Sequence, residues 1–426
     1  MKTIQWVLFV GLLLIVGLMA LYAPSVSAAP TQVYPGDNVQ AKIDATPAGG
    51  TVLVNQGVYH QSVVISKSLT LLSDRAVLDG SEPADTGTTL GHHAIDVAEG
   101  TTNVVIDGFE IRNYNQGGFR TNAGTGILAY YATSYVTIRN NNMHDNRADI
   151  WAYNYGDEDA PHHNHWTIVN NNINDIFCTN LSYGVISGNA VTLTEVTDIG
   201  IRIEAFIRYA SPTADPLTVT DINITNNTIR GGGGAAFDFA GGITLDATSR
   251  HGEKVYLQNV RVTGNEISDL ASNGIYVSSF VGDPDTHPGG IAEVRSLTIQ
   301  NNDIVRNAAC GTKMEGVIQS SLQGNTIKSN GEAGIQLNSV TACNINSNVV
   351  NRNLDGISLA ASSGNTIQNN TTSRNGRYGI SLADLSHNNL VRLNQALNNT
   401  TFDLVQDATC TGNVWKNNNF GTKSGF

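Results

Sequence analysis

Charged residues are scarce in this chain, because Asp, Glu, Lys and Arg make up only 14% of its 426 residues. Acids outnumber bases, and the formal net charge is −12. A phosphate backbone needs many cations to neutralise it, so this balance argues against a nucleic-acid partner. It also disfavours a purely electrostatic hold on an acidic polysaccharide.

Cysteine is scarce as well, with four residues in the whole chain: Cys178, Cys310, Cys343 and Cys410. Exported proteins whose fold depends on disulfides have many more cysteines than this, in much shorter chains. The count is compatible with one disulfide, and none of the spacings is that of a metal-binding motif. The fold must therefore depend on a hydrophobic core.

Long apolar runs are absent except at the N-terminus, where Trp6–Tyr22 is almost uninterrupted apolar sequence. Lys2 precedes this run, and a stretch of small residues that ends at Ala29 follows it. This order predicts a secretory signal peptide, with cleavage after Ala28 or Ala29. The run is long for a signal peptide, so an uncleaved membrane anchor is the alternative.

The chain does contain a repeat with a period in the low twenties. The segments Gly334-Ile-Gln-Leu, Gly356-Ile-Ser-Leu and Gly379-Ile-Ser-Leu lie 22 and 23 residues apart. Asparagines recur between them every 22 to 24 residues, at Asn302, Asn325, Asn348, Asn370 and Asn394. Short strands with this period indicate stacked coils, each paired with its neighbours about 4.8 Å away. The asparagines are expected to bond to one another and to turn backbone, which is a structural role.

Similar turns recur earlier in the chain at larger spacings, so insertions must leave the stack there. The clearest insertions are Tyr153–His165, Tyr209–Leu217, Ser249–Lys254 and Phe280–Ala292.

Both ends of the stack need to be closed. Asp37–Ala45 reads as a short amphipathic helix, with Asp37 or Asn38 as N-cap and Val39 and Ile43 facing inward. At the other end, Thr411–Phe420 breaks the regular repeat and is predicted to seal the last coil with Trp415 and Phe420. We therefore expect a signal peptide (1–29), an N-terminal cap (30–50), a solenoid (51–408) and a C-terminal cap (409–426).

The segment from Asp37 to Leu72 resembles the opening of the pectin-lyase-like superfamily. There a capping helix leads into Gly-x-Thr-Val-x-Val, here Gly49–Val54, and Gly-x-Tyr, here Gly57–Tyr59. With the repeats, the resemblance covers nearly the whole mature chain. It implies an all-β fold, a right-handed parallel β-helix solenoid with an N-terminal capping helix. It implies no single reaction, because that superfamily includes lyases, hydrolases, esterases, epimerases and non-enzymes.

The signatures of individual families mostly fail. Pectin methylesterases carry an acid where this chain has Gln61. Mannuronan epimerases use Asp-Pro-His followed by an acid, whereas this chain offers Asp159-Ala-Pro-His-His, with an extra residue. The motifs of polygalacturonases and of the first pectate lyase families are absent.

The repeat predicts which side chains lie on the outside of one sheet, because strand side chains alternate between its faces. The outward pairs are Leu128/Tyr130, Trp151/Tyr153, Arg202/Glu204, Thr244/Asp246, Tyr276/Ser278, Lys313/Glu315 and Gln336/Asn338. They are followed by the smaller pairs Ser358/Ala360 and Ser381/Ala383. The strip changes from aromatic through charged to small, and the inserted loops are expected to wall it into a groove.

Such a strip suits a carbohydrate, because aromatic rings can stack on sugar rings. The predicted substrate-binding residues are Trp151, Tyr153, Tyr130, Glu315 and His251, and the predicted catalytic residues are Glu204, Asp246, Arg202, Lys313 and Tyr276. Two carboxylates on adjacent coils would raise the pKa of one of them, as a glycoside hydrolase needs. A lyase or epimerase would instead use Arg202 or Lys313 to neutralise a uronate, and Tyr276, His251 or a loop histidine as base.

Plainer interpretations stay open for the same residues. Outward Arg/Glu and Lys/Glu pairs are usually solvated ion pairs, and outward aromatics can pack beneath loops. The polar stretch His144–His165 is rich in histidine and acids but matches no strong metal motif. No cofactor is expected, with Ca²⁺ at Asp157–Asp159 or at Asp283 and Asp285 as a weak alternative.

The sequence therefore predicts a secreted, carbohydrate-active β-helix that acts on polysaccharide as a lyase, epimerase or glycoside hydrolase. The alternative is a non-catalytic glycan-binding or envelope scaffold protein. An accessory protein that handles metal is a third hypothesis, although Met/Cys clusters suited to copper are missing. The expected partner is a polysaccharide, with no nucleic acid and with membrane contact only through an uncleaved anchor. We expect a monomer located outside the cell or in its envelope.

Overall fold

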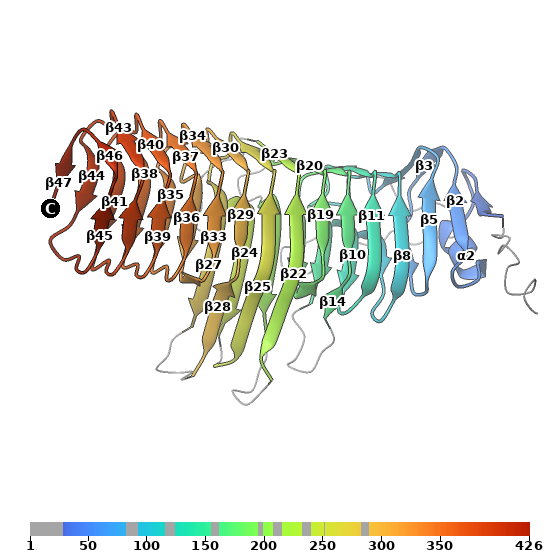
Figure 1. Cartoon of the computed structure of the whole chain (residues 1–426). Coiled ribbons are helices and arrows are strands. Elements are labelled where there is room, and N and C mark those ends of the chain that lie inside the picture. Colours follow the sequence, from blue (N-terminus) through green and yellow to red (C-terminus); the bar gives the residue numbers. More distant parts are fainter. Residues whose placement is uncertain are drawn as a thin grey trace, which may run out of the picture.

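The computed structural model describes residues 29–81, 93–115, 124–154, 162–194, 199–207, 215–231, 240–250, 252–282 and 289–426. The predicted signal peptide lies outside these ranges apart from its last residue. Within them, the strands form three sheets in which all pairings are parallel, and the coils stack into one elongated solenoid (Figure 1). No helix in this part of the chain has the length and apolar composition needed to cross a bilayer.

Each coil contributes strands to the three sheets in turn. Sheet A contains β1 (Thr31–Val33), β2 (Thr51–Val54), β5 (Leu69–Ser73), β8 (Thr102–Asp107), β11 (Ser134–Arg139), β14 (His163–Asn164), β15 (Thr167–Val169), β18 (Leu181–Ser182), β19 (Val185–Ser187), β22 (Leu217–Thr225), β25 (Lys254–Thr263), β28 (Ile291–Arg295), β29 (Thr298–Gln300), β32 (Val317–Ile318), β33 (Ser321–Gln323), β36 (Asn344–Asn346), β39 (Thr366–Gln368), β42 (Leu390–Arg392) and β45 (Val414–Lys416).

Sheet B contains β3 (Gly57–Tyr59), β6 (Ala76–Asp79), β9 (Glu110–Arg112), β12 (Asn142–His144), β16 (Asn172–Ile173), β20 (Ala190–Thr192), β23 (Thr228–Arg230), β26 (Glu266–Ser268), β30 (Asp303–Val305), β34 (Thr326–Lys328), β37 (Val349–Asn351), β40 (Thr371–Ser373), β43 (Gln395–Leu397) and β46 (Asn419–Phe420). Sheet C contains β4 (Val63–Ile65), β7 (His93–Val97), β10 (Thr125–Tyr130), β13 (Ala148–Tyr153), β17 (Ile176–Thr179), β21 (Ile201–Phe206), β24 (Gly241–Ser249), β27 (Asn273–Val281), β31 (Thr312–Glu315), β35 (Ala333–Asn338), β38 (Asp355–Ala360), β41 (Tyr378–Ala383), β44 (Phe402–Gln406) and β47 (Lys423–Ser424).

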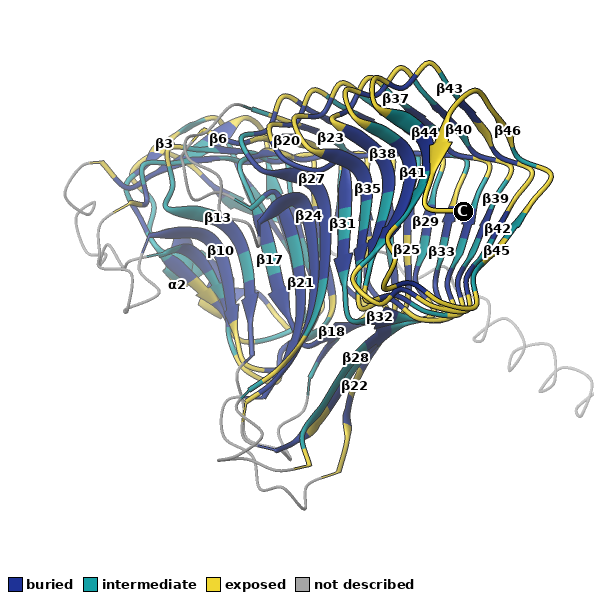
Figure 2. Ribbon diagram, turned by 90° about the vertical axis from the view of Figure 1, so that its left-hand side faces the viewer, coloured by how far each residue is buried: buried dark blue, intermediate teal, exposed yellow. Residues whose placement is uncertain are grey.

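The core lies inside the coils and is built by alternation along each strand. The predicted repeats align in register, with Ile335 opposite Ile357 and Leu337 opposite Leu359. These four side chains are fully buried, while the residue between each Ile and Leu faces out. Seen from the C-terminal end, buried residues follow the walls of the stack and many exposed ones lie at its turns (Figure 2).

The predicted asparagine ladder is confirmed at the corner between sheets A and B. The Oδ1 atom of Asn348 accepts hydrogen bonds from the backbone N–H and side-chain amide of Asn325, at 3.0 and 2.9 Å. Asn370 accepts the same two bonds from Asn348, and Asn394 accepts them from Asn370. A second ladder, which the sequence reasoning missed, joins Asn307, Asn330, Asn353, Asn375 and Asn399. Buried turn backbone is thereby satisfied at two corners of each C-terminal coil.

The two ends of the stack differ. The predicted helix is α2 (Val39–Ala45); Asn38 caps it by accepting from the N–H of Ala41, and Val39 and Ile43 are buried. At the C-terminus the sequence predicted a break in the repeat, but β45, β46 and β47 continue it by pairing with β42, β43 and β44. The C-terminal segment is therefore one more coil.

The insertions concentrate at the edges of sheet C. The four predicted insertions connect sheet C strands to sheet A strands, from β13 to β14, β21 to β22, β24 to β25 and β27 to β28. Beside these insertions, eight residues of β22 between Leu217 and Thr225 pair with β25, and β24 pairs with β27 up to Ser249. These long strands extend beyond the regular coils on one side of the stack (Figure 1).

Candidate functional site

The predicted outward strip lies on the outer face of sheet C, from β10 to β35, and the register confirms its order. Glu204 lies opposite Asp246, Tyr276 opposite Lys313, and Lys313 opposite Gln336. We call these outward residues the sheet C strip. The structure inserts a coil that the sequence reasoning missed, because β17 lies between β13 and β21 and adds Phe177 and Thr179. The turn at Asn171 was the available signal, since such a turn is followed by a sheet C strand in other coils.

The aromatic part of the strip is a set of rings stacked on one another. Tyr130 and Tyr153 stack with ring centroids 5.0 Å apart, and Trp151 stacks on Phe177 at 5.6 Å. Trp151 also meets Tyr153 edge to face. Because the rings stack along the solenoid axis, neighbouring side chains already cover much of their faces. The expectation that these faces are free for sugar rings is corrected: Tyr153 is buried, and Tyr130, at 37%, is the most exposed ring of this group.

Arg202 links the two predicted catalytic carboxylates. Its Nε donates to Asp246 Oδ2 at 2.8 Å and its Nη2 donates to Glu204 Oε1 at 3.0 Å. Ser278 donates to the other oxygen of Asp246 at 2.8 Å. Both acids are buried, and the guanidinium lies over the Phe177 ring. The acids therefore share one cation.

The cause of the perturbed acidity differs from the expected one. The pKa of Asp246 is raised, but by burial, while Arg202 and Ser278 act in the opposite direction. Repulsion between two paired carboxylates was the predicted cause. Because Arg202 is bound to both acids, burial and not carboxylate repulsion raises the pKa of Asp246.

The second polar group of the strip joins Tyr276, Lys313 and Glu315. The Tyr276 hydroxyl donates to Glu315 Oε2 at 2.6 Å, and Lys313 Nζ lies 3.3 Å from Glu315 Oε1. Burial and the nearby Glu315 raise the pKa of Tyr276, which keeps the phenol neutral. Burial tends to raise the pKa of Glu315, but the bonds from Tyr276 and Lys313 outweigh it and lower that pKa. A neutral phenol beside a strongly acidic carboxyl is a poor base, so this group suits binding better than proton abstraction.

Asp96 extends the strip toward the N-terminus, opposite Leu128. Burial raises its pKa to about 6. One of its carboxylate oxygens has no hydrogen-bond partner among the described residues. Sequence reasoning did not select Asp96, because its strand lacks the Gly-Ile-x-Leu pattern.

Comparisons with known proteins agree on the fold. Residues 221–424, slightly less than half of the chain, match the family model described as "Periplasmic copper-binding protein (NosD)". The periplasmic alginate epimerase AlgG is 12% identical, with a TM-score of 0.51, over 91% of this chain and 83% of its own. The Dettilon tailspike protein is 14% identical, with a TM-score of 0.50, over 91% of this chain and 68% of its own. A search of curated proteins found no significant match.

The chain folds as a right-handed parallel β-helix. The resemblance seen in the sequence is thus confirmed for the fold. Structural likeness at these identities does not imply a shared reaction, so the chemistry of this β-helix depends on its own residues.

The described residues do not fit a copper site. They contain no group of three or more His, Cys, Asp or Glu side chains placed to hold a metal ion. All four cysteines are free and buried, so the possible disulfide is absent. Burial raises the pKa of Cys310 to about 12 and of Cys343 to about 11, which disfavours the thiolate that binds metal.

The remaining predicted polar residues are dispersed or undescribed. His251 and the candidate Ca²⁺ ligands Asp157–Asp159, Asp283 and Asp285 lie outside the described residues. His163 is fully buried, and burial lowers its pKa to about 3. His144 bonds to Asp145 on the side of sheet B, away from the sheet C strip.

Proposed function

We propose that this protein is a non-catalytic glycan-binding β-helix of the cell envelope or the extracellular space, which holds a polysaccharide against the sheet C strip. The observation that carries the proposal is the bridge from Arg202 to both Glu204 and Asp246. The acids that catalysis would require are already bonded to a cation of the same strip. Tyr276 and Lys313 are likewise bonded to Glu315.

The polar composition of the strip suits a chain rich in hydroxyl groups. Its carboxylates outnumber its cations, which are Arg202 and Lys313 and are both bonded to acids of the strip, so the strip does not select a strongly anionic ligand. Gln336 and Asn338 continue it with amides, which donate and accept hydrogen bonds as sugar hydroxyls do. Tyr130 at the other end offers an aromatic surface.

The location and the ligand class have independent support. The N-terminal sequence predicts export, and two of the matches are named for periplasmic proteins. One of these, the alginate epimerase, is named for a polysaccharide. This is an analogy of fold, and it supports a glycan partner without naming which one.

Binding of the mature protein to a panel of neutral and acidic polysaccharides, measured by affinity electrophoresis, tests the proposal. Tyr130→Ala should weaken binding by about threefold or more, because it removes the exposed ring of the strip. Tyr183→Ala is the matched control, since Tyr183 is 50% exposed but lies on the sheet A side. Equal binding by wild type and both variants, or no binding to any polysaccharide, would refute the proposal.

Glycoside hydrolysis is a second candidate, favoured by the raised pKa of Asp246 beside Glu204. A general acid needs such a shift. New reducing ends from a bound polysaccharide, lost in Asp246→Asn and retained in Tyr183→Ala, would establish this enzyme. Unsaturated products absorbing in the ultraviolet would instead indicate a lyase. Binding without either product supports the non-catalytic function.

A further inference from the structure

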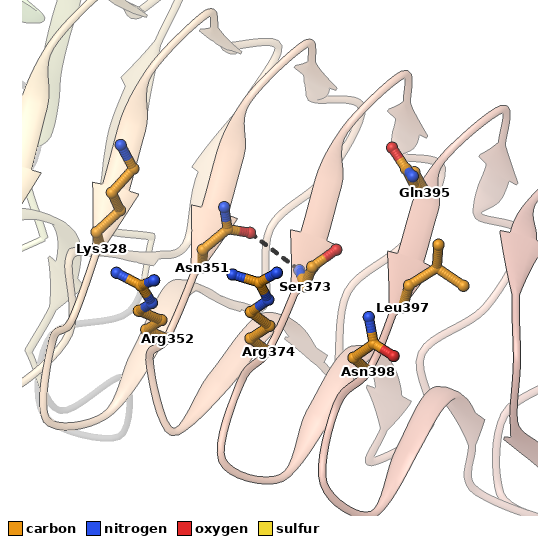
Figure 3. A pocket seen from close by; sticks show the side chains of 8 residues that line it. All are labelled: Lys328, Asn351, Arg352, Ser373, Arg374, Gln395, Leu397 and Asn398. Carbon is orange, nitrogen blue, oxygen red and sulfur yellow. Dashed lines mark hydrogen bonds between the residues drawn. The ribbon is translucent and has the colours of Figure 1, made fainter.

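A group of cations lies on sheet B, on a different face of the solenoid from the sheet C strip. Lys328, Arg352 and Arg374 come from three successive coils and line a surface hollow of about 430 Å³ (Figure 3). The hollow lies over β34, β37, β40 and β43, and its other walls are mainly polar, including Asn351, Gln395 and Asn398.

Several cations of the neighbouring coils are paired with acids. Arg306 forms two bonds to Asp269, Arg377 is paired with Asp355, and Lys313 with Glu315. Lys328, Arg352 and Arg374 make no ion pair with any described residue. Like charges on adjacent coils repel by up to about 1 kcal/mol per pair in water, so the cluster does not stabilise the fold. The cluster is a positively charged patch in a chain whose net charge is −12.

The backbone fixes where these side chains project. Lys328 lies opposite Asn351 in the register of sheet B. Arg352 and Arg374 both occupy the turn position that follows a sheet B strand, with φ of 58° and 57°. Equivalent positions on neighbouring coils are about 4.8 Å apart, so the two arginines project side by side. Figure 3 shows both guanidinium groups beside Asn351, whose Oδ1 accepts from the N–H of Ser373 at 3.0 Å.

We propose that this hollow binds the carboxylate or sulfate groups of an acidic glycan that runs along the solenoid axis. Guanidinium groups bind oxyanions through two parallel hydrogen bonds, and two adjacent guanidiniums present a double fork. The cations recur once per coil, as the charges of an acidic glycan recur along its chain. The amides of Asn351, Gln395 and Asn398 match the hydroxyl groups between those charges.

A membrane surface fits the hollow less well than a glycan. Leu397 is the one apolar side chain among its lining residues, so the hollow offers little to insert among lipid chains. The proposed site shares no residue with the sheet C strip. Its test can therefore succeed or fail independently of the function proposed there.

The test is a titration of the mature protein with size-defined oligogalacturonate by isothermal calorimetry at low and moderate salt. Affinity should fall as salt rises, and the double variant Arg352→Gln/Arg374→Gln should bind at least tenfold more weakly. Arg306→Gln is the control, since it removes an exposed cation of the same row outside the hollow. It should change the affinity less than threefold.

Other probes distinguish the sources of the anion. Inorganic sulfate that binds as tightly as the oligosaccharide would overturn the assignment to a glycan chain. Tighter binding to vesicles containing anionic lipid would overturn it in favour of a membrane surface. An equal loss in Arg306→Gln and in the double variant would mean that net charge, and not this hollow, determines binding. Unchanged binding by Tyr130→Ala would show that the sheet B site acts separately from the strip.

Discussion

At the scale of single residues, Arg202 is the side chain on which the centre of the sheet C strip depends. Arg202→Met would leave Glu204 and Asp246 buried without their shared cation, at a cost of about 3 kcal/mol near neutral pH. The loss should be smaller at pH 4, because Asp246, whose pKa is raised by burial, is then more readily protonated. Urea unfolding at the two pH values measures this loss of stability.

The control is Arg230→Met, which breaks an exposed ion pair with Glu266 and should cost less than about 1 kcal/mol. A loss of stability in Arg202→Met that does not change with pH would contradict the argument.

Asp96 gives a second prediction at this scale, because burial raises its pKa to about 6. A carboxyl whose folded pKa lies above its unfolded value stabilises the fold fully at pH values below the unfolded value. That contribution disappears as pH rises through about 6. Asparagine does not titrate. The free energy of unfolding of Asp96→Asn, relative to that of wild type, should therefore rise by about 2 kcal/mol as the pH increases from 4 to 8.

Thermal or urea unfolding of both proteins across this pH range checks the Asp96 prediction. Glu99→Gln, which replaces an exposed acid three residues later, is the control and should show little change. A stability difference between Asp96→Asn and wild type that stays constant with pH would show that Asp96 has a partner in the fold.

At the scale of elements, the turn between sheets A and B requires a left-handed backbone. Leu393 occupies it with φ of 57° and is 50% exposed, whereas Asn301, Asn369 and Asn417 fill the same position in other coils. Asparagine tolerates this conformation better than leucine, so Leu393→Asn should stabilise the protein by about 1 kcal/mol. The unfolding midpoint measures the change. Leu354→Asn, at an exposed leucine whose φ is not positive, should give no gain; equal effects would contradict the assignment to backbone strain.

The same elements show what the sequence could predict. Period, strand register and the asparagine ladder follow from local rules, because each coil must repeat the geometry of its neighbour. The outward order from Tyr130 to Asn338 followed from that register. The register did not predict the bridge from Arg202 to Glu204 and Asp246 or the stacking of Trp151 on Phe177, because both depend on side-chain conformations across coils. The spacings of the cations in the basic hollow, 24 and 22 residues, match the repeat, but the hollow was missed because only the outward positions of the Gly-Ile-x-Leu strands were followed.

At the scale of the whole molecule, the two ends of the solenoid are closed unequally. Helix α2 buries Val39 and Ile43 against the first coil. The last coil is largely exposed and is held by Trp415, which packs against the core and donates to Gln406 Oε1 at 2.9 Å. In a stack whose coils contact only their neighbours, stability is a sum of local terms, so the C-terminal end should open first.

Hydrogen exchange can follow this opening coil by coil. Amides of β45 to β47 should exchange faster than those of the N-terminal strands β2 to β8. Trp415→Ala removes the partner of Phe426 and of Gln406, so it should speed exchange in β42 to β47 at least tenfold and leave β2 to β8 unchanged. Phe280→Ala, at a ring that is 54% exposed on an extended strand, should leave the C-terminal amides unaffected. Faster exchange along the whole stack in Trp415→Ala would instead mean that the solenoid unfolds as one cooperative unit, in which case the weak end would limit the stability of both proposed binding faces.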